Sequence, residues 1–92
     1  MSNTELGAGA PLSRAKVGQG GVIVRVDGGL APGVLSPEEL ERRLLEMGFV
    51  EGARVRVLHE GVLGGDPIAV KVDDMRVAVR RAEARAIEVN FD

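Results

Sequence analysis

Residues that could perform chemistry are sparse in this chain of 92 residues. It contains no cysteine, which excludes thiolate metal sites, disulfides and thiol redox chemistry. The one histidine is His59, and the only serines are Ser2, Ser13 and Ser36. A nucleophilic site needs a nucleophile and a base within hydrogen-bond reach, whereas Ser36 is explained as a helix cap and the other two lie in or near the start of the chain. The sequence therefore indicates a protein that is not an enzyme.

His59 is the one weak candidate for a metal ligand. Fe(II) sites usually combine imidazole with carboxylate groups. Glu60 follows directly, so its side chain in a strand points to the opposite face, and Asp66 across the next loop adds at most one more ligand. Two ligands make a poor site. We therefore expect a half-exposed, solvated His59 at a strand end, and no cofactor beyond weak transition metal binding.

Composition, charge and missing motifs argue against several other classes of function. Aromatic residues make up 2% of the chain and the net charge is −2, which argues against nucleic-acid binding by base stacking or by phosphate neutralisation. No segment reads GxxxxGK[ST], so no P-loop binds a nucleotide. No apolar run approaches the ~18 residues of a membrane helix, and the N-terminus lacks the pattern of a signal peptide. We expect a cytoplasmic protein that is not membrane-embedded.

Four arginines are candidates for partner binding. Arg54 and Arg56 share the outer face of one expected strand, and Arg76 and Arg80 share that of another. If the two strands are neighbours, the four side chains form a basic stripe suited to an acidic partner. The alternative is an ordinary solvated face.

The segment 61–65 carries the other candidates, Val62 and Leu63, in an expected hairpin loop. Exposed apolar side chains often mark interaction sites. The alternative is that Leu63 folds back and plugs the end of a barrel. Phe49, just after the expected helix, is assigned to the core because large apolar residues are usually buried.

The elements that position these residues follow from the spacing of apolar residues. Ser36 as N-cap and Pro37 at the first helical position begin a helix over 37–47, and Gly48 ends it. Five short segments have the composition or alternation of strands: 22–26, 53–60, 67–73, 75–80 and 85–91, with one helical turn over 81–84. In the first of these, Val22, Val24 and Val26 share a face, and in the second His59 lies on the inner face with Val55 and Val57.

This tally predicts one mainly β domain over 12–92, after a disordered leader over 1–11. Five short strands with one helix between the first and second favour a small closed barrel, because closure removes unpaired strand edges. The oligomeric state stays open, since an unpaired edge near a barrel seam could pair with a second copy.

Several short blocks between Leu12 and Val89 form a specific combination: the helix end LERRLLEMG with the turn FVEG (40–52), VRVL (55–58), LGGDPI (63–68), VAVRRAEA (77–84) and IEV (87–89). Taken together, these blocks resemble the FeoA family of ferrous iron transport proteins. The resemblance implies an SH3-like barrel and a protein-binding, accessory or regulatory role beside FeoB, a membrane permease for ferrous iron with a GTPase domain. The same barrel is similar to the C-terminal domain of DtxR-type repressors, so a metal-responsive regulatory domain is the alternative. Whether the protein activates, stabilises or inhibits the permease stays open.

Overall fold

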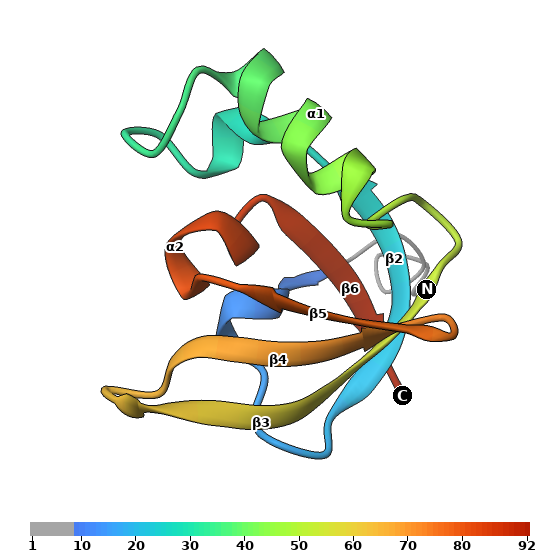
Figure 1. Cartoon of the computed structure of the whole chain (residues 1–92). Helices are drawn as coiled ribbons and strands as arrows, with labels where there is room; N and C mark the ends of the chain where they lie inside the picture. The colour runs from blue at the N-terminus through green and yellow to red at the C-terminus, as the bar shows by residue number, and fades with distance from the viewer. Residues whose placement is uncertain (1–8) are drawn as a thin grey trace.

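The segments in which apolar and polar residues alternate form a single antiparallel sheet in the computed structural model, which describes residues 9–92. The sheet has six strands: β1 (Ala10–Pro11), β2 (Gly20–Val26), β3 (Arg54–Leu63), β4 (Asp66–Val72), β5 (Met75–Val79) and β6 (Ile87–Phe91). Their order is β1-β6-β2-β3-β4-β5, and the sheet curls strongly on itself (Figure 1). The prediction of a mainly β, SH3-like fold is confirmed.

Two details of the predicted barrel differ from the structure. Within the described residues no pairing joins β5 to β1, so the sheet is curled but open. The predicted strands correspond to β2 through β6, and β1 is an additional strand that pairs with β6. β1 begins two residues before the predicted domain start at Leu12, so Ala10 and Pro11 do not belong to a disordered leader. The rest of that predicted leader, 1–8, lies outside the described residues.

Shifts of register move two sets of side chains away from their predicted faces. In β2, Ile23 is buried while Val22 and Val24 are half-buried. The pairing with β6 shifts between Ile23 and Arg25, so Val26 packs against the core instead of sharing the face of Val22 and Val24. A second shift, in β3 between Val57 and His59, moves His59 to the other face.

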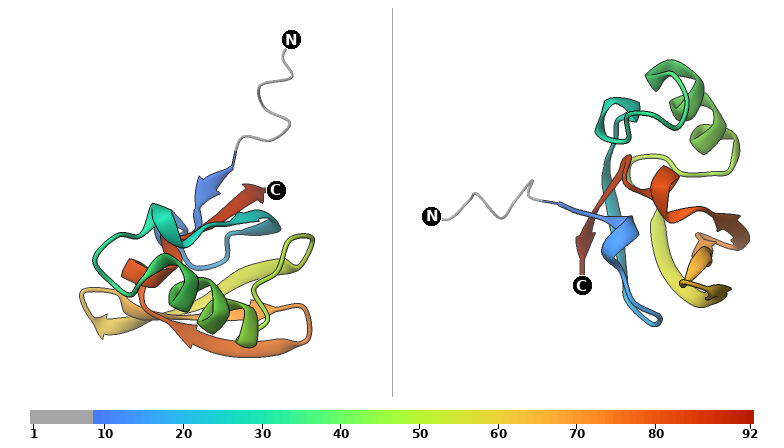
Figure 2. Two further views of the ribbon diagram at one scale, coloured as in Figure 1. Left: turned by 90° about the horizontal axis from the view of Figure 1, so that it is seen from above. Right: turned by 90° about the vertical axis from the view of Figure 1, so that its left-hand side faces the viewer.

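The helix α1 (Pro37–Glu46) connects β2 to β3, as predicted. The Ser36 hydroxyl accepts the backbone N–H of Glu39 at 3.3 Å, and Pro37 occupies the first turn. Gly48 ends the helix with a φ of 98°, a conformation that glycine adopts without steric cost. The helix lies at one end of the curled sheet, away from the β3–β4 hairpin (Figures 1 and 2). Neither α1 nor any other helix between residues 9 and 92 is long and apolar enough to cross a membrane.

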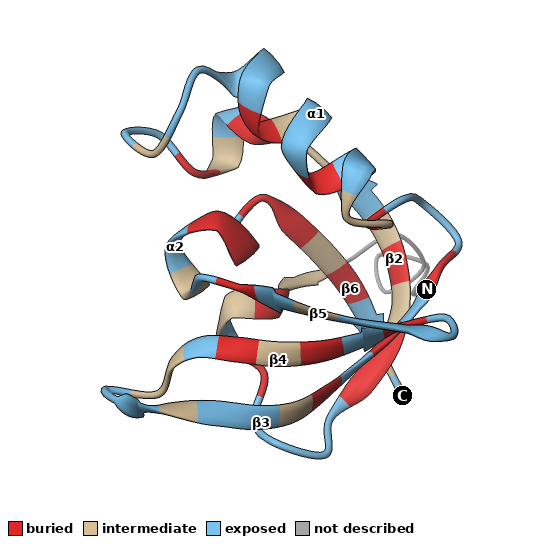
Figure 3. Cartoon of the chain, viewed as in Figure 1, coloured by how far each residue is buried: buried red, intermediate tan, exposed pale blue. Residues whose placement is uncertain are grey.

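The core lies between the concave face of the sheet, α1 and the short α2 (Arg81–Ala84), which joins β5 to β6. Two 3-10 turns complete the fold, η2 (Leu12–Arg14) and η3 (Gly28–Leu30). Phe49 is 1% exposed, which confirms its assignment to the core. Figure 3 shows that buried positions concentrate along the middle of the strands, whereas the far end of the β3–β4 hairpin is exposed.

Candidate functional site

The tip of the β3–β4 hairpin presents two large apolar side chains to solvent. Val62 is 98% exposed and Leu63 is 83% exposed. Gly64 and Gly65 turn the chain with φ angles of 72° and 78°, which other residues rarely adopt. The hairpin carries Leu63 away from the core, so the alternative in which Leu63 plugs the barrel is wrong. Exposed neighbouring aliphatic side chains of this kind are suited to burial against a partner.

The base of this hairpin is held by Arg81, a residue that the sequence analysis did not single out. Its guanidinium donates to Oε2 of Glu60 at 2.7 Å, to the carbonyl of Gly65 at 3.0 Å and to the carbonyl of Ser13 at 2.6 Å. Its backbone N–H donates to Oδ1 of Asp66 at 2.8 Å. The planar fork of arginine suits such multiple contacts. Arg81 therefore ties the hairpin to η2 and α2, and the apolar tip projects from a braced base.

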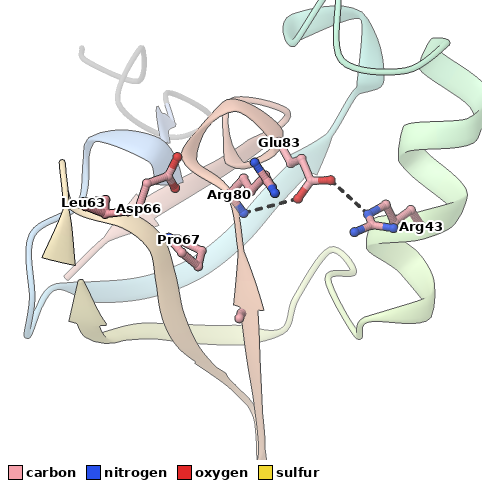
Figure 4. Close-up of a pocket in the computed structure, with 7 residues that line it drawn as sticks. Arg43, Leu63, Asp66, Pro67, Arg80 and Glu83 are labelled. Carbon is pink, nitrogen blue, oxygen red and sulfur yellow. Dashed lines mark hydrogen bonds and ion pairs between the residues drawn. The ribbon is translucent and has the colours of Figure 1, made fainter. Parts of the chain in front are cut away.

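A cleft of about 460 Å³ opens beside the tip, with Leu63 in its wall (Figure 4). The other lining residues come from α1, α2, β4 and β5: Arg43, Asp66, Pro67, Ala78, Arg80 and Glu83. The carboxylate of Glu83, with only 8% of its side chain exposed, lies 2.9 Å from Nε of Arg43. Its other oxygen accepts the backbone N–H of Arg80 at 3.2 Å. The ion pair thus joins α1 to α2 across the cleft.

Arg80 lines this cleft together with Ala78, which lies on the outer face of β5. β5 ends at Val79, and Arg80 is the N-cap of α2. Its backbone is still extended, so the alternation from Arg76 through Ala78 reaches Arg80. Arg80 therefore shares the outer face with the other predicted arginines but lies at the cleft, apart from them.

The other three arginines lie on the outer face of the sheet, but their strands are not neighbours. β4 separates β3 from β5. On β3, Arg54 donates to both carboxylate oxygens of Asp92 at 3.0 and 3.1 Å, and Arg56 lies 3.8 Å from Asp92. On β5, Arg76 is exposed. A hollow of about 600 Å³ lies along this face, with Lys71 of β4 among its lining residues; the sequence analysis missed Lys71.

His59 also lies on the outer face, contrary to the prediction. The register of β3 against β4 passes from Val57–Val70 to His59–Ala69, so one extra residue on β3 reverses the alternation. His59 is exposed. No three His, Asp or Glu side chains between residues 9 and 92 lie close enough together to hold a metal ion. A single exposed imidazole does not fit a transition-metal site by itself.

Arg25 and Asp27, at the end of β2, shift each other's pKa. A hydrogen bond from the Arg25 guanidinium is the main cause that lowers the pKa of the Asp27 carboxyl, and the backbone N–H of Gly29 adds to it at 2.8 Å. The same hydrogen bond raises the pKa of Arg25. Because Asp27 also caps η3, this pair has a structural use.

Comparison with known proteins places the whole described domain in one family. The family model described as the FeoA domain matches residues 10–90. The chain is 40% identical over 80 residues to an Fe(2+) transport protein A/Fe(2+) transporter FeoB fusion protein of Porphyromonas gingivalis. That match covers 87% of this chain and 8% of the relative, so the chain spans less than a tenth of the fusion protein.

Two solved structures illustrate the fold. FeoA of Stenotrophomonas maltophilia, described as a prokaryotic SH3 domain protein and crystallised with zinc, is 33% identical, with a TM-score of 0.68 over 86% of this chain and 87% of that one. A manganese-dependent transcriptional repressor in complex with manganese is 24% identical, with a TM-score of 0.72 over 88% of this chain and 36% of that one. The second likeness shows a shared fold alone.

Proposed function

Because the chain belongs to the FeoA family, we propose that it is a cytosolic accessory protein of bacterial ferrous iron uptake that binds and regulates an FeoB-type permease. It acts by contact and catalyses no reaction of its own. The observation that carries the proposal is the fusion relative, in which an FeoA region and an FeoB transporter share one polypeptide. Covalent linkage raises the effective concentration of two modules that work together.

The surface that we assign to this contact is the β3–β4 tip. Val62 and Leu63 present apolar surface that the fold itself does not use, while Arg81 holds the base of the hairpin in place. A preorganised apolar projection binds at a lower entropic cost than a mobile one. We therefore expect Leu63 to enter an apolar recess on the cytosolic part of the permease.

The test is binding of the full chain to the cytosolic part of its permease, measured by titration calorimetry in the nucleotide-free, GDP-bound and GTP-bound states. Leu63→Glu is expected to weaken binding strongly. Leu45→Glu is the matched control, because Leu45 is 57% exposed on α1, away from the hairpin. Absence of binding by the unaltered chain in every nucleotide state would refute the proposed partner. Equal binding by both variants would refute the assignment of the tip.

A metal-responsive regulatory domain is the second candidate, favoured by the zinc complex of the S. maltophilia relative. Since no three His, Asp or Glu side chains lie together within 9–92, such a site at His59 would need further ligands from outside the described residues. Titration of the ¹⁵N-labelled protein with Fe(II), Mn(II) or Zn(II) distinguishes the two candidates. Saturable amide shifts around His59 that His59→Ala abolishes would support metal sensing, and diffuse broadening alone would count against it.

A further inference from the structure

Three cations form one row across the outer face of the sheet. Arg56 of β3 pairs in register with Lys71 of β4, and Lys71 pairs in register with Arg76 of β5. Residues directly opposite one another in antiparallel strands point to the same face, and all three side chains are exposed. Lys71 lies between Arg56 and Arg76 and connects them. The three side chains together therefore form a continuous row, which the two arginines alone would not.

The charge of this row is only partly neutralised by its neighbours. Asp92 lies 3.8 Å from Arg56 at one end of the row, and the Arg56 guanidinium also donates to the carbonyl of Gly18. Among residues 9–92, neither Lys71 nor Arg76 forms an ion pair. The two acidic residues of the β4–β5 turn, Asp73 and Asp74, line the same hollow as Arg56 and Lys71, and Asp73 also accepts the backbone N–H of Arg54 at 3.0 Å. Like charges directly opposite one another in a sheet are destabilising. The row therefore lowers the stability of the fold and has no evident structural use.

The next row along the strands is small and less polar. His59, Ala69 and Ala78 are paired in register across β3, β4 and β5. Because Ala69 and Ala78 have short side chains, the sheet surface is lower there than at the neighbouring cations. A helix that lies perpendicular to the strands fits over the two alanines, with one side facing the cations.

The spacing of the cations matches the spacing of carboxylates on a helix. Neighbouring strands are about 4.8 Å apart, so the outer members of the row are separated by about 10 Å. Residues i, i+4 and i+7 lie on one face of an α-helix, and i and i+7 are about 10.5 Å apart along its axis. In an extended peptide, side chains on one face recur only about every 6.6 Å, and the third lies about 13 Å from the first. The backbone spacing of the row is therefore closer to the repeat of a helix than to that of a strand.

We propose that the outer face of β3, β4 and β5 docks an acidic helix of a partner protein, with carboxylates at i, i+4 and i+7 over Arg56, Lys71 and Arg76 and with the body of the helix over Ala69 and Ala78. The inference deepens the proposed function and rests on it, because the helix belongs to the permease or to its assembly. The β3–β4 tip then supplies an apolar contact and this face supplies charge complementarity, which governs orientation and association rate.

The test uses the ¹⁵N-labelled full chain and two lactam-bridged helical peptides of equal composition. One carries glutamates at i, i+4 and i+7, and the other carries them at i, i+5 and i+6, on three different faces. The first peptide is expected to shift the amides of β3, β4 and β5 and to bind about tenfold more tightly than the second. Arg76→Glu should weaken it by about tenfold or more, whereas Arg42→Glu, an exposed arginine on α1, should not.

Three results would overturn the inference. They are equal binding of the two peptides, absence of any shift on this face, and binding of inorganic tripolyphosphate to the row as tightly as the first peptide, which would indicate a general anion site. The permease itself separates this inference from the proposed function. If the unaltered chain binds the permease and Arg76→Glu binds it equally well, only the helix-docking inference fails. If the unaltered chain does not bind, the proposed partner fails, and the peptide titration still decides the use of the row.

Discussion

Replacing Leu63 by glutamate distinguishes a docking role from a structural one, because the side chain contributes very different free energies to folding and to binding. With 83% of its surface exposed, Leu63 realises only about a sixth of the roughly 2–3 kcal/mol that full burial of a leucine supplies. The stability lost on substitution should therefore be about 0.5 kcal/mol or less. A partner that covers the rest of the side chain gains about 2 kcal/mol from it, so Leu63→Glu should weaken binding by about thirtyfold.

Two measurements on the same protein preparation check this prediction. Urea unfolding followed by circular dichroism gives the free energy of unfolding, and calorimetry against the cytosolic part of the permease gives the dissociation constant. Val62→Ala provides an uncharged second variant at the same tip, where 98% exposure predicts no measurable loss of stability. A loss of unfolding free energy above about 2 kcal/mol for Leu63→Glu would show that Leu63 belongs to the core and is not a docking residue.

Three further predictions concern the fold that supports the surfaces. Val70→Ala, at a fully buried position, should lower the unfolding free energy by about 1–3 kcal/mol in urea titrations; an effect below about 0.5 kcal/mol would contradict its place in the core. Arg81→Met should cost about 2 kcal/mol, since it removes charge-assisted hydrogen bonds, and hydrogen exchange should accelerate in β3 and β4 near the tip; unchanged exchange there would show that Arg81 does not brace the hairpin. The folded-state pKa of Asp27 is lowered, so its contribution to stability is present above the unfolded pKa of about 3.9 and is lost as pH falls through the lower folded value. The stability difference between the unaltered chain and Asp27→Asn should shrink on acidification from pH 6 in urea titrations, and a difference that grows would mean that the sign is wrong.

The local parts of the fold could be predicted because their causes are local. Ser36, Pro37 and Gly48 define the ends of α1 through capping and backbone geometry within a few residues. The strands follow from alternation, and the hairpin at 61–65 follows from its glycines, whereas the sequence left open whether Leu63 points to solvent or into the barrel. The bulge in β3 could not be predicted, because one extra residue leaves no mark in composition while it reverses the face of His59.

The candidate surfaces could be predicted only where one strand determines them. Arg54 and Arg56 were placed on the outer face correctly, since both lie on β3. The order of strands decides which side chains become neighbours, and Lys71 was missed because nothing in the sequence places β4 between β3 and β5. Arg81 was missed for a related reason, because its partners lie 15 to 68 residues away along the chain.

The row of cations belongs to one continuous stretch of chain, from β3 through β4 to β5. The connections within this stretch are short, so the entropy lost on closing them is small. β6 by contrast pairs with β1 and β2, near the opposite end of the described chain. In such a topology the local hairpins close early and the distant pairings close late. The face proposed for docking thus depends least on the slowest part of folding, and a partner could engage it as soon as the three-stranded meander has formed.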